Sequence, residues 1–437
     1  FQAEDGIRDR SPSRGLGDVY KRQPYALCTM HYALRLSLFI YLCTMDFILN
    51  EDQQAVKEAA RDFAQNQLLP GVIDRDRDMT YPTEQVKMMG EMGFLGMMVS
   101  PEYGGGGMDT LSYVLAMEEI SKVDASCSVI MSVNNSLVCW GLEKYGNEDQ
   151  KQRYLSRLAT GEIIGAFCLS EPEAGSDATS QQTIAEDKGD HYLVNGTKNW
   201  ITNGGKSAIH LVMAQSHREL KHKGINTLII ERAYPGVSIG AKEDKMGIRA
   251  SDTHSIMYSD VKVGKENRVG DDGFGFKFAM STLDGGRIGI AAQALGIAAG
   301  AYELALKYAQ ERTTFGKPIM THQAISFKLA DMATEIEAAR LLVYRAARMK
   351  DLGMDISTAA AMAKLFASEV AMKTTTEAVQ IHGGYGYVKE YHVERLMRDA
   401  KITQIYEGTS EIQRLVISRA VLKGDLYQPM QSELQKA

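Results

Sequence analysis

The sequence is poor in cysteine, and its few cysteines stand far apart. The 437 residues include five of them: Cys28, Cys43, Cys127, Cys139 and Cys168. No two form a C-x-x-C pair or show the spacing of a zinc finger, so neither a disulfide scaffold nor a structural metal is indicated. We therefore expect a reduced intracellular protein, cytoplasmic in a bacterium or in the mitochondrial matrix if the source is eukaryotic.

An excess of positive charge is also missing. The chain has 49 Lys and Arg against 55 Asp and Glu, a formal net charge of -6, and its pI is about 5.9. A general nucleic-acid binder needs clustered Lys and Arg to displace counterions from phosphates. The composition therefore argues against nucleic acid as a partner and leaves room only for local basic sites.

Uninterrupted apolar runs of membrane-spanning length are absent as well. The stretch "YALCTMHYALRLSLFIYLCT" is broken by His31 and Arg35, so we expect no membrane anchor. Lys21 and Arg22 followed by "LSLFIYLC" imitate a signal peptide.

The opening "FQAEDGIRDRSPSRGLGDVYKRQ" has no initiator Met and resembles a translated adaptor sequence. We expect residues 1–44 to be a non-native leader and the fold to begin at Met45, where an amphipathic helix starts.

Several common active-site motifs are missing too. No G-x-G-x-x-G follows a predicted strand and opens a helix, and "TNGGKS" fails the P-loop pattern because Trp200 stands in place of the first glycine. H-E-x-x-H, the EF-hand loop and G-x-S-x-G are absent, which disfavours metal hydrolysis and serine acyl transfer. Any dinucleotide must therefore be held in another way.

What the sequence does contain is three successive patterns. Residues 45–160 have apolar positions at helical spacing, opened by an Asn50 cap with Gln53 three residues later. Residues 161–272 consist of short segments rich in β-branched and aromatic side chains, and residues 273–437 return to the helical period. The sequence predicts an α+β protein with an N-terminal α-helical domain, a middle β-barrel or β-sandwich domain and a C-terminal four-helix bundle, packed as one body.

Turn signals separate the predicted strands of the middle domain. Within "HYLVNGTKNWIT", Asn195 and Gly196 form the dipeptide that most strongly favours a two-residue hairpin. We therefore expect the chain to reverse at this point.

Two strings of the middle domain place polar turns at strand ends. "FCLSEPEAGSD", residues 167–177, leaves an apolar strand at Ser170, and "NWITNGG", residues 199–205, puts an aromatic beside hydroxyl and amide side chains. Such groups suit a polar ring edge or a pyrophosphate. Taken alone, the first string is better explained by an ordinary β-turn, and the second is also compatible with core packing.

Glycines interrupt an apolar helix in "LDGGRIGIAAQALGIAAGA", residues 283–301. Each glycine costs about 1 kcal/mol relative to alanine, so a ligand or another backbone is expected close to this helix. Asp284 and Arg287 share one helical face, where they form either a surface ion pair or a charged fork for a ligand phosphate.

Two further strings lie at breaks between C-terminal helices. "QERTTFGKPIMTHQ" contains Arg312 and Gln323, and "QIHGGYGY" contains Gln380 and the pair Gly383–Gly384. The glycine pair allows a ligand to approach the backbone, and the arginine can pair with a diphosphate.

Glu407 stands between an apolar stretch and a small-residue turn in "KITQIYEGTSEIQR", residues 401–414. From this string alone, an exposed loop glutamate or an acid at a helix N-terminus is the simpler interpretation.

Taken together and in this order, "LSEPEAGSDA", "NGTKNWITNGG", "DGGRIGIAAQALGIA", "RTTFGKPI", "AVQIHGGYGY" and "RDAKITQIYEGTSEIQR" resemble the acyl-CoA dehydrogenase family over residues 45–425, and its short-chain, butyryl-CoA branch most. The resemblance implies a homotetrameric flavoprotein of fatty acid metabolism. It would use FAD to convert a short acyl-CoA into its trans-2-enoyl-CoA and pass the electrons to an electron-transferring flavoprotein.

The resemblance also implies roles for individual residues. Glu407 would be the catalytic base. Substrate contacts would come from Ser176, Asp284, Arg287 and Gly408. The flavin side of FAD would be lined by Phe167, Leu169, Ser170, Ser176, Trp200, Ile201 and Thr202. The adenosine diphosphate of FAD would be held by Thr409, Ser410 and Glu411, and by residues of a neighbouring subunit: Arg312, Gln323, Gln380, Ile381, His382, Gly383 and Gly384.

The implied chemistry explains why Glu407 would stand where it does. Removal of a weakly acidic α-proton, while a hydride leaves the β-carbon for flavin N5, requires a carboxylate made more basic by exclusion of water. The apolar neighbours Ile405 and Tyr406 favour that exclusion, and Gly408 lets a thioester oxygen approach the backbone N–H of Glu407.

Two alternatives use the same scaffold. An acyl-CoA oxidase would pass the electrons to oxygen, and a non-catalytic flavoprotein would bind nucleic acid, for which this acidic chain shows no basic stretch.

Overall fold

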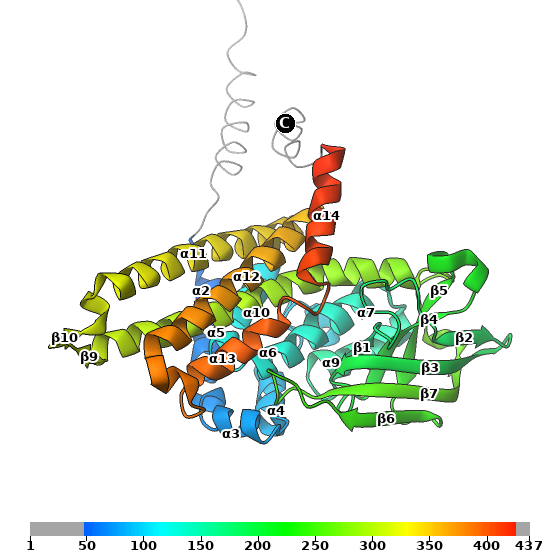
Figure 1. Ribbon diagram of the computed structural model, residues 1–437. Helices are drawn as coiled ribbons and strands as arrows, with labels where there is room; N and C mark the ends of the chain where they lie inside the picture. Colours follow the sequence, from blue (N-terminus) through cyan, green and yellow to red (C-terminus); the bar gives the residue numbers. More distant parts are fainter. Residues whose placement is uncertain (1–47, 425–437) are drawn as a thin grey trace, which may run out of the picture. The chain divides into compact units, whose positions relative to one another are not determined.

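The structure is a computed structural model that describes residues 48–424, with helices at both ends of this range and strands in the middle (Figure 1). The predicted α+β class and the predicted order of helical, sheet and helical parts are confirmed. The predicted leader, residues 1–44, and Met45 lie outside the described residues. From Asn50 onward, the described residues form a single unit by their mutual contacts.

The first part is helical from its first cap. The backbone N–H of Gln53 donates to Asn50 Oδ1 at 2.8 Å, and the Asn50 N–H donates to Gln53 Oε1 at 3.1 Å, the reciprocal cap that the sequence predicts. The helices of this part are α2 (Glu51–Phe63), η1 (Ala64–Leu68), α3 (Val72–Arg77), α4 (Thr83–Glu91), η2 (Pro101–Tyr103), α5 (Thr110–Val123), α6 (Ala125–Ser132), η3 (Val133–Cys139), α7 (Trp140–Tyr145), α8 (Glu148–Gln150), η4 (Lys151–Leu155) and α9 (Ser156–Ala159).

The middle part is one eight-stranded sheet. Its strand order is β6-β7-β3-β2-β4-β5-β8, and β1 pairs in parallel with β4. Side chains from six of the strands meet in one apolar core, so the sheet curves around a common interior. The strands are β1 (Gly165–Cys168), β2 (Ile184–Asp187), β3 (His191–Thr202), β4 (Ile209–Gln215), β5 (Ile225–Glu231), β6 (Val237–Lys242), β7 (Thr253–Gly264) and β8 (Arg268–Val269), with η5 (Arg218–Gly224) and η6 (Lys265–Asn267) between them.

The hairpin predicted at Asn195–Gly196 is wrong. Both residues lie inside β3, at a bulge in its pairing with β7. The Asn195 side chain bonds across the strands to the backbone and side chain of Asp260, at 2.8 and 3.0 Å. Gly196 is required because a Cβ there would lie 2.5 Å from Thr183 Oγ1. Glycine therefore serves close strand packing at this position rather than a turn.

The last part is a helical bundle. The four helices α10, α11, α12 and α13 pack on one another, and α5 of the first part packs against α10 and α11 (Figure 1). The elements are α10 (Gly275–Glu311), β9 (Thr313–Thr314), β10 (Lys317–Pro318), η7 (Ile319–Thr321), α11 (Gln323–Asp351), α12 (Ser357–His382), η8 (Gly383–Tyr387), α13 (His392–Ile402) and α14 (Ser410–Lys423).

The helix α10 forms the centre of this bundle. Every residue from Gly285 to Ala301 is buried, which explains why the sequence of this helix has no polar face. Two helical stretches, Ala125–Tyr145 and Gly275–Glu311, are long and apolar enough to cross a membrane by length and composition, yet 94% and 83% of their apolar windows are buried inside the protein.

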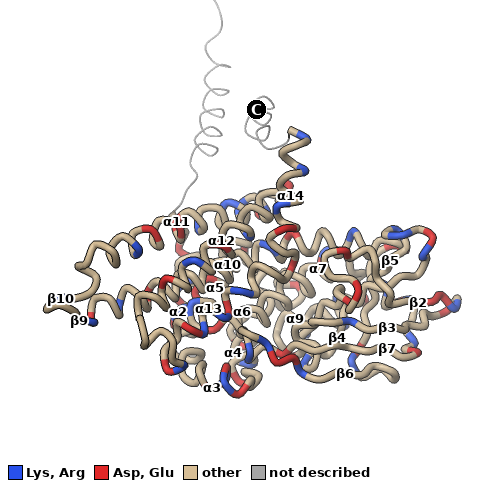
Figure 2. Tube along the Cα trace, viewed as in Figure 1, with Lys and Arg blue, Asp and Glu red and all other residues tan. Residues whose placement is uncertain are grey.

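Acidic and basic residues are intermixed along both the helical parts and the sheet, as Figure 2 shows. This distribution accords with the small formal net charge of -6.

The contact between α10 and α5 generates a test of the fold. A Cβ at Gly296 would lie 2.3 Å from the Glu118 carbonyl oxygen and 2.6 Å from Ser121 Cβ, so the two helices would have to move apart. We expect Gly296→Ala to lower the free energy of unfolding by about 1 to 3 kcal/mol in urea denaturation followed by circular dichroism. Gly285→Ala in the same helix is the control, because its Cβ would meet only the flexible Lys350 Nζ at 3.4 Å. Equal stability of the two variants would contradict this packing.

Candidate active site

Glu407 lies in the short connection between α13 and α14 and turns its carboxylate into the protein. Its backbone has a φ of 53°, which is rare for a residue with a side chain, and Gly408 follows with a φ of 92°. Glu407 Oε2 is buried and has no hydrogen-bond partner among the described residues. The expectation of an ordinary exposed loop acid is therefore wrong, and a buried carboxylate oxygen is left free to accept a proton.

The carboxylate of Glu407 lies against Gly286 in the centre of α10. A Cβ at Gly286 would stand 2.2 Å from Glu407 Oε2 and 2.7 Å from Leu137 Cδ2. Any larger residue at position 286 would displace the acid. The glycine that looks costly in the helix sequence is thus explained by the approach of a side chain from a distant loop.

Burial controls the acidity of Glu407. Loss of water around the carboxyl raises the pKa of Glu407 to about 7, although the positive charges of Lys364 and Arg287 oppose this rise. Burial also lowers the pKa of the nearby Lys364 to about 8. A carboxylate with a pKa near neutrality can take a proton at neutral pH and later release it.

The loop around Glu407 is tied to the core on both sides. On one side, the Tyr406 hydroxyl donates to Gln293 Oε1, and the Gln293 amide donates to the Ala125 carbonyl oxygen at 2.9 Å and to Ser128 Oγ at 3.0 Å. These bonds connect the loop to α10 and to the start of α6.

On the other side of the loop, the Gly408 carbonyl oxygen accepts from Lys364 Nζ at 2.5 Å and from Gln413 Nε2 at 2.8 Å. Thr409 caps α14 through its hydroxyl, and the Ser410 N–H donates to the Gln404 carbonyl oxygen at 2.9 Å. The backbone strain at Glu407 is thus held by bonds on both of its neighbours.

Asp284 and Arg287 stand on α10 beside Gly286. Arg287 Nη1 bonds Asp284 Oδ1 at 2.5 Å, and Ser357 Oγ lies 3.4 Å from the same oxygen. The expected ion pair thus forms, but it is largely buried: Arg287 is only 6% exposed, and its buried Nε has no hydrogen-bond partner in the described part of the chain. Burial raises the pKa of Asp284, and the positive charge of Arg287 opposes this rise.

The two polar strings of the sheet meet at the ends of β1 and β3. The Asn199 N–H donates to the Ser170 carbonyl oxygen at 2.9 Å, which joins the two segments. Of the residues assigned to the flavin side by resemblance, Ile201 and Leu169 are buried, Phe167, Ser170 and Thr202 are half-buried, and Ser176 is exposed.

Trp200 is the unusual member of this group. Its side chain is 63% exposed at the end of a buried strand, and its backbone has a φ of 61°. A large aromatic held outward in a strained conformation provides an open apolar surface, which is more typical of a binding site than of core packing.

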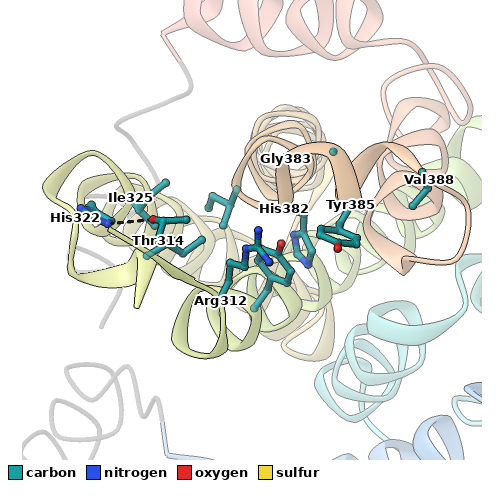
Figure 3. Close-up of a pocket in the computed structure, with 12 residues that line it drawn as sticks. Arg312, Thr314, His322, Ile325, His382, Gly383, Tyr385 and Val388 are labelled. Atoms are coloured by element: carbon teal, nitrogen blue, oxygen red, sulfur yellow. Dashed lines mark hydrogen bonds between the residues drawn. The ribbon is translucent and has the colours of Figure 1, made fainter. Parts of the chain in front are cut away.

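The third predicted group surrounds a separate cavity of about 660 Å³. Arg312, Ile381, His382, Gly383 and Gly384 line it, and Figure 3 shows Arg312 beside the rings of His382 and Tyr385. Gln323 and Gln380 are exposed and are not among its lining residues. The described lining contains an arginine and two histidines but no acid.

This cavity lies far from Glu407. Lys364 and His382 are 18 positions apart on the same helix α12, which at 1.5 Å per residue corresponds to about 27 Å. Lys364 contacts the Glu407 loop, and His382 lines the cavity. The Glu407 region and the cavity thus lie near different ends of α12.

Sequence reasoning missed several residues that support the site. Lys198 is fully buried, and its Nζ bonds the Leu169 carbonyl oxygen at 3.0 Å and Glu171 Oε1 at 2.7 Å, which fixes the turn after β1. Lys364 is equally buried. A single lysine within the apolar string "AAAMAKLFA" was the available signal.

Two features characterise the site. A carboxylate with a near-neutral pKa faces the central helix of a bundle, and a sheet with an exposed aromatic at its strand ends adjoins the same bundle.

Models of three protein-family domains match nearly all of the described residues. The acyl-CoA dehydrogenase N-terminal domain matches residues 50–162, the middle domain residues 166–261, and the C-terminal domain residues 273–422. The chain belongs to the acyl-CoA dehydrogenase family, and it is an oxidoreductase of that family.

Individual relatives narrow the resemblance to the short-chain members. The short-chain specific acyl-CoA dehydrogenase of Clostridium acetobutylicum is 50% identical over 379 residues, which cover 87% of this chain and 100% of that protein. The solved structure of butyryl-CoA dehydrogenase from Megasphaera elsdenii has a TM-score of 0.85 and 49% identity, over 86% of this chain and 100% of that one.

Two further solved structures are similar to this chain. One is described as the electron transferring flavoprotein of Acidaminococcus fermentans, with a TM-score of 0.86 and 52% identity over 86% of this chain and 100% of that one. The other is a glutaryl-CoA dehydrogenase from Mycobacterium smegmatis in complex with FADH2, with a TM-score of 0.83 and 31% identity over 88% of this chain and 98% of that one.

The burial of Glu407 predicts a pH-dependent effect on stability. Its pKa rises from 4.5 to about 7 on folding, so the folded protein loses stability as the pH rises through this window and the buried carboxyl ionises. Glu407→Gln cannot ionise. We expect it to be more stable than the unchanged protein by roughly 2 kcal/mol at pH 8 and by much less at pH 4.5, in urea denaturation at the two pH values.

Glu84→Gln removes an exposed acid of α4 and serves as the matched control, with no such pH-dependent gain. A Glu407→Gln variant whose stability differs from the unchanged protein equally at both pH values would show that the carboxyl is in contact with water.

Proposed function

We propose that this protein is a short-chain acyl-CoA dehydrogenase that converts butyryl-CoA into crotonyl-CoA with Glu407 as the catalytic base. The observation that carries the proposal is the buried, unpartnered Glu407 Oε2 beside Gly286, with a pKa near 7. The similarity to short-chain and butyryl-CoA dehydrogenases over at least 86% of the chain supports the substrate class.

In this proposal, the α-carbon of the thioester lies beside the Glu407 carboxylate, which rests against Gly286. Glu407 takes the α-proton on its carboxylate, and the electron pair of that C–H bond becomes the second bond between the α- and β-carbons. The Glu407 backbone N–H, next to the glycine at 408, suits the thioester oxygen, on which negative charge accumulates. The buried Arg287 and Asp284 orient the CoA arm of the substrate.

The cofactor is FAD, which when bound accepts the hydride that leaves the β-carbon. The residues present fit it. The exposed Trp200 and the strand-end groups Ser170 and Thr202 provide a surface and polar partners for a flavin ring. Thr409, Ser410 and Glu411 stand at the N-terminus of α14, where the helix dipole favours the negative charge of one end of a diphosphate. In a relative of 31% identity, a complex with FADH2 supports the same cofactor.

The separate cavity completes the cofactor site of a neighbouring subunit. Arg312 and the open glycines Gly383 and Gly384, at which a Cβ would meet nothing within 4 Å, suit a diphosphate, and the cavity lies about 27 Å along α12 from the base. Large apolar side chains lie exposed at this end of the bundle, including Phe315 at 96% and Tyr387 at 87%. We assign the protein to a homotetramer built from such pairs.

The electron acceptor in this proposal is an electron-transferring flavoprotein, supported by the likeness to a structure described by that name. The relatives include bacterial and mitochondrial proteins, so the compartment follows the source: bacterial cytoplasm or mitochondrial matrix.

The role of Glu407 is tested by substitution. We expect Glu407→Gln to retain bound FAD and to lose turnover by about 10²- to 10⁴-fold, because the variant lacks the proton acceptor. The measurement is anaerobic bleaching of the flavin by butyryl-CoA in a stopped-flow instrument, with Glu84→Gln as the control for loss of an acid elsewhere. Bleaching at a near-normal rate in Glu407→Gln would assign the base to another residue.

The shared cofactor site is tested with hybrid assemblies. Arg312→Ala and Glu407→Gln are each expected to impair the enzyme as pure variants. A mixed dimer contains one Arg312→Ala subunit and one Glu407→Gln subunit. The first subunit keeps its Glu407, and its site would be completed by the intact Arg312 of the partner subunit. We therefore expect about half of the normal activity after co-expression with two affinity tags and tandem purification. Activity no higher than the mean of the two pure variants would show that both residues serve a site within one chain.

A further inference from the structure

Lys364 is a lysine in an unusual place. It lies on α12 with 0% exposure, surrounded by the alanines of "AAAMAKLFA". Among the described residues its ammonium has one hydrogen-bond partner, the Gly408 carbonyl oxygen at 2.5 Å, and no carboxylate within 4.0 Å. Burying a lysine without an ion pair is costly, so its retention requires a reason.

The hydrogen bond to Gly408 does not by itself supply that reason. The same carbonyl oxygen already accepts from Gln413 Nε2 at 2.8 Å, and Gln413 also reaches the Glu407 carbonyl oxygen at 3.3 Å. An uncharged amide thus satisfies this turn. What Lys364 adds and Gln413 lacks is a positive charge next to the buried carboxylate.

The charged groups around Glu407 are few, and they come from separate elements. Arg287 of α10 is also positive, but it is paired with Asp284 at 2.5 Å, which offsets its charge. Tyr113 of α5 and Tyr406 of the loop face Glu407 as neutral phenols whose pKa values burial raises. Glu411 of α14 acts on Lys364 rather than on Glu407. Lys364 is therefore the cation near Glu407 that no acid neutralises at close range.

We propose that Lys364 is a positioning residue of the reaction: its ammonium fixes the Glu407–Gly408 turn through the Gly408 carbonyl oxygen and places a positive charge beside the buried Glu407 carboxylate. Without this charge, burial would leave Glu407 protonated and unable to accept the α-proton. The inference rests on the proposed role of Glu407 as the base.

The test is the pH profile of flavin reduction by butyryl-CoA in the purified holoenzyme, from pH 5.5 to 9. In the unchanged protein, the rate rises with pH as Glu407 ionises, with a midpoint near its pKa of about 7. Lys364→Met removes the charge, so we expect the midpoint to move up by about one pH unit, because an opposite charge has been lost beside a carboxylate. Lys364→Arg restores a cation and should return the midpoint toward its original position.

Gln413→Leu is the matched control. It removes a donor to the same carbonyl oxygen but no charge, so it should slow the reaction or lower stability without moving the midpoint. Lys364→Gln keeps a donor and removes the charge, and it replaces Lys364→Met if that variant yields no holoenzyme.

An unmoved midpoint in the neutral Lys364 variants, or an equal movement in Gln413→Leu, overturns the inference. These results are distinct from failure of the proposed function, in which the unchanged protein itself shows no flavin reduction by butyryl-CoA.

Discussion

The structure depends on one contact: the carboxylate of Glu407 is pressed against the backbone of α10 at Gly286, where its Oε2 is buried and has no hydrogen-bond partner within residues 48–424. A buried acid of this kind is unfavourable by itself. It persists because the loop that carries it is bonded to the core on both sides, through Tyr406 to Gln293 and through Gly408 to α12 and α14. Stability elsewhere in the bundle thus maintains a strained, buried acid beside the helix α10.

The sequence predicted those parts of the fold that follow from local rules. The Asn50 cap and the helical spacing of the first and last parts are properties of neighbouring residues, and they appear as expected. The hairpin at Asn195–Gly196 failed because the tight space next to Thr183, rather than a turn, requires the glycine. The sequence of a dipeptide does not show which residue, distant in the sequence, packs against it in the fold.

The candidate site was predictable in its residue types and not in its geometry. Glu407, Asp284 and Arg287 stood out as charges within apolar or glycine-rich strings, and the fold brings them to one region. Their partners Gln293 and Gln413 were missed because each looks ordinary within its own helix, and Lys364 was missed although it is the one charge in an apolar string. Their importance arises from contacts between helices far apart in the sequence, which periodicity does not encode.

The close packing of α10 on α5 has an evolutionary consequence. The backbones touch at Gly296, and at Gly300 a Cβ would lie 2.3 Å from the Lys122 carbonyl oxygen, so α10 cannot slide or tilt without breaking the core. Main-chain packing therefore fixes the position of the helix against which the acid rests. Changes of shape around Glu407 on this scaffold would have to come from exchanges of side chains such as Leu137, which lies close to Gly286, while the helices stay in place.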